Sequence, residues 1–230
     1  LYKAQDIPLS PLVADTFYQA LPPFVKADST IGRIRWRWRF DTPEKHQRMV
    51  KGYYRMISTI DDNVGRLLST LEEMNVSENT IIIFTSDNGY FLGERGLSGK
   101  WLMYENSLRV PLLIYDPMQE VKPTNRAEIA LNIDIAPTIL DYAGVAIPPT
   151  IQGRSLRPLV NNESVDWRAD FLCEHLYELQ YIPKSEGVRS NDWKYFRYID
   201  YPDVEELYYL KDDPLEQHNL VTHSSYQDTL

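Results

Sequence analysis

The chain has 230 residues, of which 43% are hydrophobic and 25% are charged, and its formal net charge at pH 7 is −9. A chain of this length and hydrophobic content can bury a core as one or two domains. The negative charge argues against nucleic acid as a bulk partner. No apolar run approaches the roughly 18 residues of a membrane-spanning helix, no signal-peptide pattern opens the chain at Leu1, and the single cysteine, Cys173, excludes an internal disulfide framework.

Residues 1–32 are rich in proline and lack a hydrophobic period, so we expect an extended surface loop there. From Arg33 to Phe40, arginines alternate with isoleucine and aromatic residues. If this segment is extended, it presents a cationic face and an aromatic face. Arg35 and Arg37 would then guide a polyanionic substrate, because arginine pairs well with oxyanions. The alternative is a solvated strand or loop whose arginines pair with the surplus acidic residues.

The segment from Pro43 to Met74 predicts a long amphipathic helix packed on a sheet, because its apolar residues recur at helical spacing. Asp41 or Thr42 would cap its N-terminus. The neighbouring Asp61 and Asp62 invite interpretation as a metal-binding pair. Adjacent residues of a helix do not face one another, however, so we place both at the helix surface.

Thr80 to Thr85 is a continuous apolar, β-branched run, which is typical of a strand buried on both faces of a sheet. Asp87 and Asn88 follow it, and Gly89 permits a sharp turn. They therefore lie where open α/β sheets bind ligands, beyond the carboxyl end of a strand. Their oxygens suit a hard cation such as Ca²⁺ or Mg²⁺, and Lys100 could bring a second positive charge to form an anion site. The alternative is a simple turn, since Asp, Asn and Gly are common turn residues.

Downstream, Val110 to Tyr115 predicts a second buried strand, and Ile135 to Tyr142 predicts a helix that Asp134 caps and Gly144 ends. Capping explains Asp134 without a catalytic role. The stretch from Pro148 to Pro158 is rich in turn residues, and a boundary after it divides the chain into residues 1–160 and 161–230. Beyond the boundary we expect short strands at Arg168 to His175, Ser185 to Asp192, Lys194 to Ile199 and Glu206 to Leu210.

A series of short motifs after the first predicted strand carries a resemblance to a known family. The series reads Asp87-Asn88-Gly89, Leu92-Gly93-Glu94, Gly96-Leu97, Gly99-Lys100, Tyr104-Glu105 and Leu108-Arg109-Val110-Pro111. It resembles the metal-and-lysine segment of the type I sulfatases, in the alkaline phosphatase-like superfamily. The resemblance implies an α/β fold, as part of an alkaline phosphatase-like sandwich with a mixed central sheet flanked by helices. It also implies a small antiparallel C-terminal subdomain with a helix.

The resemblance implies that Asp87 and Asn88 help to hold one Ca²⁺ ion and that Lys100 contacts the sulfate of the substrate. Sulfatases of this type also carry an upstream Cys or Ser in the pattern C/S-x-P-x-R, which is oxidised to formylglycine, and an upstream aspartate pair that completes the calcium site. The only cysteine, Cys173, does not lie in such a pattern. The chain thus resembles the C-terminal half of a sulfatase, inactive alone, with the formylglycine and the other calcium ligands in a missing N-terminal half.

The same resemblance implies a sulfated carbohydrate as substrate, first of the glycosaminoglycan type and second a small aryl sulfate, and an extracytoplasmic location. Arg95, His175, Lys184 and Arg189 are candidate contacts to the substrate, although each could instead be a surface or structural residue. Two alternatives stay open. One is a phosphoesterase or phosphonate hydrolase of the same superfamily, and the other is a non-catalytic carbohydrate-binding relic or pseudoenzyme.

Overall fold

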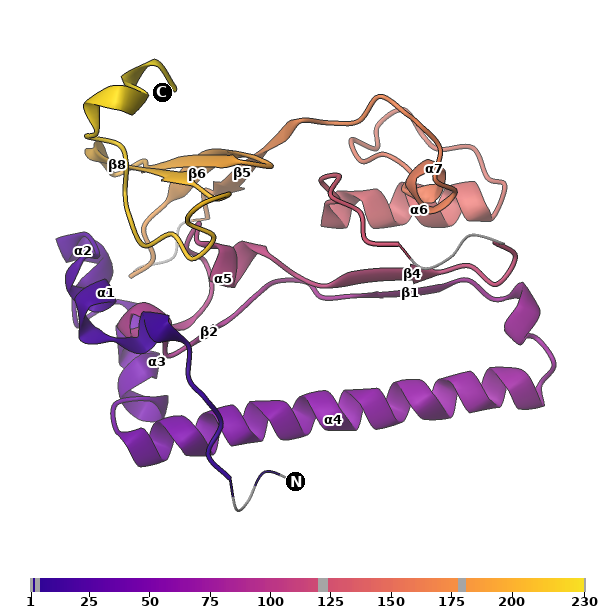
Figure 1. Ribbon diagram of the computed structural model, residues 1–230, viewed down its shortest axis with the longest axis horizontal. Coiled ribbons are helices and arrows are strands. Elements are labelled where there is room, and N and C mark those ends of the chain that lie inside the picture. Colours follow the sequence, from indigo (N-terminus) through magenta and orange to yellow (C-terminus); the bar gives the residue numbers. More distant parts are fainter. Residues whose placement is uncertain (1, 3–4, 120–123, 178–180, 230) are drawn as a thin grey trace.

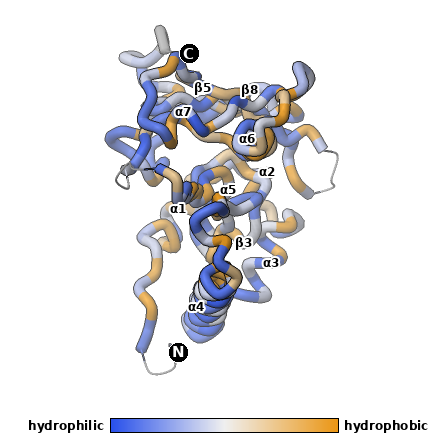
Figure 2. The backbone as a smooth tube through the Cα atoms, turned by 90° about the vertical axis from the view of Figure 1, so that its right-hand side faces the viewer, coloured by the Kyte–Doolittle hydropathy of each residue, from blue (hydrophilic) through white to orange (hydrophobic). Residues whose placement is uncertain are grey.

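The computed structural model describes residue 2 and residues 5–119, 124–177 and 181–229. Figure 1 shows a long helix, α4 (Pro43–Glu73), running beside a pair of strands, β1 (Ile82–Thr85) and β4 (Leu112–Tyr115). Figure 2 looks along α4 and shows the same layers in order, from α4 through the segment around β3 and α5 to the C-terminal sheet. The α/β class is confirmed.

The first 32 residues are not the expected extended loop. They contain three short helical segments, η1 (Pro11–Val13), α1 (Asp15–Gln19) and α2 (Pro23–Lys26). Proline stands in the first turn of η1 and α2, where its fixed φ suits the helix and its missing N–H is not needed. Leu12, Leu21 and Val25 are buried. Because these residues are irregularly spaced, the sequence pattern did not indicate that this segment contributes to the core.

The segment of alternating arginines is a helix, α3 (Ile31–Arg39), so the expected extended strand is wrong. Thr30 caps the helix, because its hydroxyl accepts a hydrogen bond from the backbone N–H of Arg33 (3.4 Å). Side chains two residues apart point in different directions on a helix. The arginines therefore do not share one cationic face, and each meets a different environment.

The long amphipathic helix is confirmed as α4, and Thr42 caps it by accepting a hydrogen bond from the N–H of Lys45 (3.3 Å). Asp61 and Asp62 are exposed, as predicted. The apolar face of α4 is not fully covered: α4, β1 and β4 line an open groove of about 580 Å³. Several large apolar side chains are exposed on these elements, among them Ile57, Ile60, Leu68, Phe84, Leu113 and Tyr115.

β1 and β4 form an antiparallel pair in which Ile83 lies opposite Ile114. We expected a mixed central sheet with β1 buried on both faces. In the part of the chain that the structure describes, β1 pairs with β4 alone, and Phe84 is 39% exposed. The faces of a strand are buried by elements packed on each side of the sheet, and the side that faces α4 is an open groove. Within the described residues, β1 is therefore neither central in a larger sheet nor buried on both faces.

Four strands after the predicted boundary form one antiparallel sheet in the order β5-β6-β7-β8, which confirms the small C-terminal sheet. Its strands are β5 (Asp170–His175), β6 (Ser185–Ser190), β7 (Trp193–Tyr198) and β8 (Tyr201–Tyr209). The main hydrophobic core contains residues from both sides of the predicted boundary. The division of the chain into two domains stays a prediction. The core includes Leu21, Val25, Phe91, Leu97, Leu102, Met103, Tyr104, Phe196, Tyr198, Tyr208 and Leu210.

The remaining elements are short. Between β1 and β4 lie β2 (Phe91–Leu92), η3 (Glu94–Gly96), β3 (Ser98–Gly99) and α5 (Glu105–Leu108), and η2 (Ser77–Asn79) precedes β1. After β4 come η4 (Asn132–Asp134), α6 (Ile135–Tyr142), α7 (Arg157–Val160) and, near the C-terminus, η5 (Ser224–Thr229). The helix α6 has the predicted bounds, and Gly144 follows it with a φ of 67°, as a helix stop requires.

Candidate functional site at the end of strand β1

Asp87 and Asn88 lie directly after β1 in a tight turn. The Asp87 carboxylate accepts a hydrogen bond from the backbone N–H of Asn88 (2.9 Å), and the Asn88 amide donates to the carbonyl of Gly89 (2.8 Å). A Cβ at Gly89 would lie 2.2 Å from the carbonyl oxygen of Asn106. Only glycine lets the two backbone segments approach this closely.

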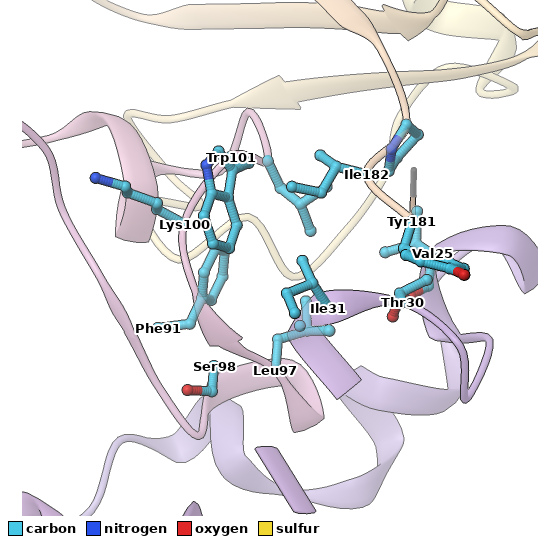
Figure 3. A pocket seen from close by; sticks show the side chains of 13 residues that line it. Val25, Thr30, Ile31, Phe91, Leu97, Ser98, Lys100, Trp101, Tyr181 and Ile182 are labelled. Carbon is cyan, nitrogen blue, oxygen red and sulfur yellow. Dashed lines mark hydrogen bonds between the residues drawn. The ribbon is translucent and has the colours of Figure 1, made fainter. Parts of the chain in front are cut away.

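Lys100 reaches the same turn. Its ammonium donates to Oδ1 of Asn88 and lies 3.8 Å from Oδ2 of Asp87. The side chain of Asp87 is 83% exposed and that of Lys100 is 37% exposed. Lys100 lies at the margin of an apolar pocket, and Figure 3 shows its ammonium end pointing away from the apolar side chains of Ile31, Leu97 and Ile182. The structure thus brings together the three residues that the sequence predicted, at a place that a ligand can reach.

The backbone around Lys100 is unusual on both sides. Gly99 has a φ of 115° and Trp101 a φ of 85°, and the second is uncommon for a bulky residue. The Trp101 N–H donates to the hydroxyl of Ser107 (3.0 Å), and the carbonyl of Ser107 accepts a hydrogen bond from the N–H of Gly89 (2.8 Å). Ser107 therefore connects the two sides of the site. Sequence reasoning missed it, because a buried serine in a short helix carries no distinctive pattern.

Asn132 also supports the turn. Its side-chain amide donates to the backbone carbonyls of Ser86 (3.2 Å) and Asp87 (3.0 Å). Two residues later, Asp134 is fully buried and accepts hydrogen bonds from the N–H of Leu131 (2.8 Å) and from Arg168. The expected helix cap is thus replaced by a buried ion pair, which is also a structural role.

The glycine-rich segment between β2 and Lys100 is attached to the helices α3 and α4. Arg33 donates to the carbonyl of Gly96 (2.6 Å), and Arg39 donates to the hydroxyl of Ser98 (3.2 Å) and to that of Tyr90 (2.7 Å), just before β2. From α4, Nε2 of His46 lies 2.8 Å from the carbonyl oxygen of Leu92. Burial lowers the pKa of His46 from its ordinary value, although the contact to the carbonyl opposes this shift. These contacts hold the loop that carries Lys100.

On its other side, the segment is attached to the C-terminal sheet by buried charges. Glu105, at the start of α5, lies 2.8 Å from the ammonium of Lys194 and 3.3 Å from Arg189. Lys194 is fully buried and also pairs with Glu216, which accepts a hydrogen bond from the backbone N–H of Glu105 (2.8 Å). Burial opposes ionisation of Glu105, but Lys194 and Arg189 lower its pKa, whereas burial raises the pKa of Glu216. We call these four residues the buried ion cluster.

Two of the four predicted substrate contacts, Arg95 and Arg189, are bonded to other parts of the chain. Arg95 is only 3% exposed and donates to the backbone carbonyls of Leu215 (2.9 Å) and Glu216 (2.6 Å). Arg189 belongs to the buried ion cluster, and Lys184 lies 3.6 Å from Asp200. His175 ends β5. For Arg95 and Arg189 these contacts favour the structural alternative that the sequence left open.

The donor atoms at the site fit a hard cation in kind. Asp87 and Asn88 offer oxygen, and the Lys100 ammonium already rests against both side chains. Two side chains fall short of the roughly six to eight oxygens that Ca²⁺ takes. Within the described ranges, no cluster of three or more His, Cys, Asp or Glu side chains could hold a metal. This pair can therefore supply part of a cation site.

Comparisons with known proteins found two matching family models and several similar proteins. The family model "Sulfatase" matches residues 22–145, and the model "N-sulphoglucosamine sulphohydrolase, C-terminal" matches residues 93–230. The N-acetylglucosamine-6-O-sulfatase of Bacteroides thetaiotaomicron is 38% identical over 187 residues, which are 79% of this chain and 34% of that protein. This chain therefore spans about a third of the length of that relative.

Two solved structures are also similar. One, determined in complex with its substrate D-glucosamine-2-N,6-O-disulfate, has a TM-score of 0.77 and 32% identity over 92% of this chain and 46% of its own. The phosphonate monoester hydrolase of Agrobacterium radiobacter has a TM-score of 0.69 and 25% identity over 82% of this chain and 40% of its own.

In the part of the chain that the structure describes, no helix is long and apolar enough to cross a membrane.

The family implies a metal ion and a formylglycine in general. Three findings agree. The motifs stand in the family's order, Asp87, Asn88 and Lys100 meet at one strand end, and two family models match most of the chain. The chain belongs to the sulfatase family.

Proposed function

We propose that the protein to which this chain belongs hydrolyses a sulfate ester of a sulfated carbohydrate. Lys100 binds the sulfate group, and Asp87 and Asn88 supply part of a site for one Ca²⁺ ion. The observation that carries this proposal is the contact of the Lys100 ammonium with both side chains at the exposed end of β1. A similar solved structure, determined with a disulfated glucosamine bound, also supports the proposal.

The residues of this chain would bind and orient the sulfate. An ammonium has three donors, so Lys100 can keep its hydrogen bond to Asn88 and still reach oxygens of a sulfate group. Charge builds up on those oxygens as the ester bond breaks, and a fixed cation stabilises it. When bound, a calcium ion would add Lewis-acid polarisation of a sulfate oxygen. The family's nucleophile, formylglycine, would come from outside this chain.

The test uses the full-length protein with N-acetylglucosamine 6-O-sulfate as substrate. Lys100→Ala should lower kcat by about a hundredfold or more, the scale of a lost charge-stabilising group. Lys211, which is exposed, provides the control, and Lys211→Ala should retain wild-type turnover. Wild-type turnover in Lys100→Ala would overturn the assignment. Calorimetric titration with Ca²⁺ should show one site, weakened in Asp87→Ala.

The similarity to a phosphonate monoester hydrolase keeps that activity as the second candidate. The same preparation should be assayed with a phosphonate monoester and with the sulfate ester. A higher kcat/KM for the phosphonate would favour the second candidate. Binding of the sulfated sugar without any turnover would favour a non-catalytic protein. We also expect an extracytoplasmic location, as the family resemblance implies, and cell fractionation would check it.

A further inference from the structure

The helix α3 carries four arginines in different environments. Arg33 is buried and bonded to the carbonyl of Gly96, Arg37 pairs with Asp28, and Arg39 bonds to the hydroxyls of Tyr90 and Ser98. Three of the four guanidinium groups therefore have a polar partner within the chain. Such partners use some of the five guanidinium donors, and the carboxylate of Asp28 also offsets the charge of Arg37.

Arg35 differs from the other three. Its guanidinium stacks on the indole ring of Trp101, with its central carbon 4.8 Å from the ring centroid. Among the described residues, no hydrogen bond or ion pair of its side chain is found, and the side chain is only partly exposed. Stacking holds a guanidinium by its flat face. Its N–H donors, which lie in the plane, stay available.

Arg35 also lies beside the residues that flank Lys100. Trp101 follows Lys100 directly, and Nη1 of Arg35 lies 3.6 Å from the position that a Cβ at Gly99 would take. The positive φ values of Gly99 and Trp101 fix this turn, and the hydroxyl of Ser107 accepts the Trp101 N–H. A second cation is thus held against the residues on both sides of Lys100, at the turn that carries this lysine.

We propose that Arg35, held on Trp101, forms a subsite for a second anionic group of the carbohydrate whose sulfate ester lies at Lys100. The proposal rests on the proposed function and names its substrate class: sugars with two negative charges. A guanidinium binds two oxygens of a sulfate or a carboxylate through parallel hydrogen bonds, so either group fits the subsite. Arg37, which the sequence placed beside Arg35 on one cationic face, has no such role.

The test compares three ligands of the full-length protein: N-acetylglucosamine 6-O-sulfate, glucosamine 2-N,6-O-disulfate, and a disaccharide that joins a uronic acid to N-acetylglucosamine 6-O-sulfate. Dissociation constants and kcat/KM are measured for wild type, Arg35→Ala, Arg35→Lys and the control Arg37→Ala. Arg35→Ala should weaken at least one doubly charged ligand about tenfold or more, the scale of a lost charge-assisted contact. It should leave the singly charged ligand unchanged.

The disulfated sugar and the uronate disaccharide distinguish a sulfate from a carboxylate as the second group. Arg35→Lys should restore part of the affinity, and Arg37→Ala should behave as wild type. Equal losses for the singly and doubly charged ligands would show that Arg35 only supports Trp101, and would overturn the proposal. A wild-type protein that binds neither doubly charged ligand more tightly than the singly charged one would also overturn the proposal. Because binding is measured as well as turnover, an inactive wild type would refute the proposed function while still testing this subsite.

Discussion

The buried ion cluster makes a large and specific prediction for Lys194. Its side chain is fully buried in β7, and its ammonium pairs with Glu105 (2.8 Å) and Glu216. The variant Lys194→Met keeps a side chain of similar length but removes the charge. It leaves two carboxylates buried at 15% and 1% side-chain exposure. Within the buried ion cluster, Arg189 is then the one remaining cation, and it contacts Glu105.

The expected loss follows from what an unpaired buried charge costs. Removing one partner of a buried ion pair destabilises a protein by about 3–5 kcal/mol. For a domain of about 150–250 residues, each kcal/mol lowers Tm by about 2–4 °C, which places the loss at about 6–20 °C for unfolding of the domain that contains Lys194. Arg197 provides a control on the same strand, because its ion pair with Glu186 is solvent-exposed. Arg197→Ala should change Tm very little.

Thermal unfolding followed by circular dichroism measures both variants. The double variant Lys194→Met/Glu216→Gln should recover part of the loss, because it removes one of the carboxylates that lost its partner. A Tm within about 2 °C of wild type for Lys194→Met, on the conversion used above, would refute the reasoning. Equal losses for Lys194→Met and Arg197→Ala would refute it too, since burial would then not decide the cost.

Two further predictions concern the site and its attachment to α4. Gly89→Ala should destabilise the folded protein by about 1–3 kcal/mol or more and abolish turnover, because its Cβ would lie 2.2 Å from the Asn106 oxygen. The control is Gly65→Ala, which has open space around it and should leave the stability in chemical denaturation unchanged or raise it. His46 has a lowered pKa, so its contribution is present above its ordinary pKa of 6.5 and is lost as pH falls below it. Tm should therefore fall from pH 7.5 to pH 5 more steeply in wild type than in His46→Gln, and parallel profiles would contradict this.

The meeting of Asp87, Asn88 and Lys100 could be predicted from the sequence because these residues lie close together along the chain. Asp87 and Asn88 follow an apolar run, and Lys100 comes 12 residues after Asn88. The period of α4 was likewise visible over its 31 residues. Local spacing of this kind is the strongest signal that one sequence carries.

The helix α3 was mistaken for a strand because an alternation of two residue types fits a period of two. What decides the structure is Thr30, which caps the helix, and the burial of Arg33 under the glycine-rich segment. Gly96 lies 63 residues further along the chain. A partner at that separation cannot be found from the pattern of a single segment.

Two of the contacts that hold the site in place follow the same rule. Asn132 donates to the carbonyl of Asp87, 45 residues away, and Lys194 pairs with Glu105, 89 residues away. Ser107 lies only six residues from Trp101, but a single buried serine carries no distinctive pattern. Variants of these three residues should therefore move Lys100 relative to Asn88 and lower kcat, whereas loss of Arg35 should act on the affinity for the second charge. These two outcomes would separate residues that orient Lys100 from a residue that selects a doubly charged sugar.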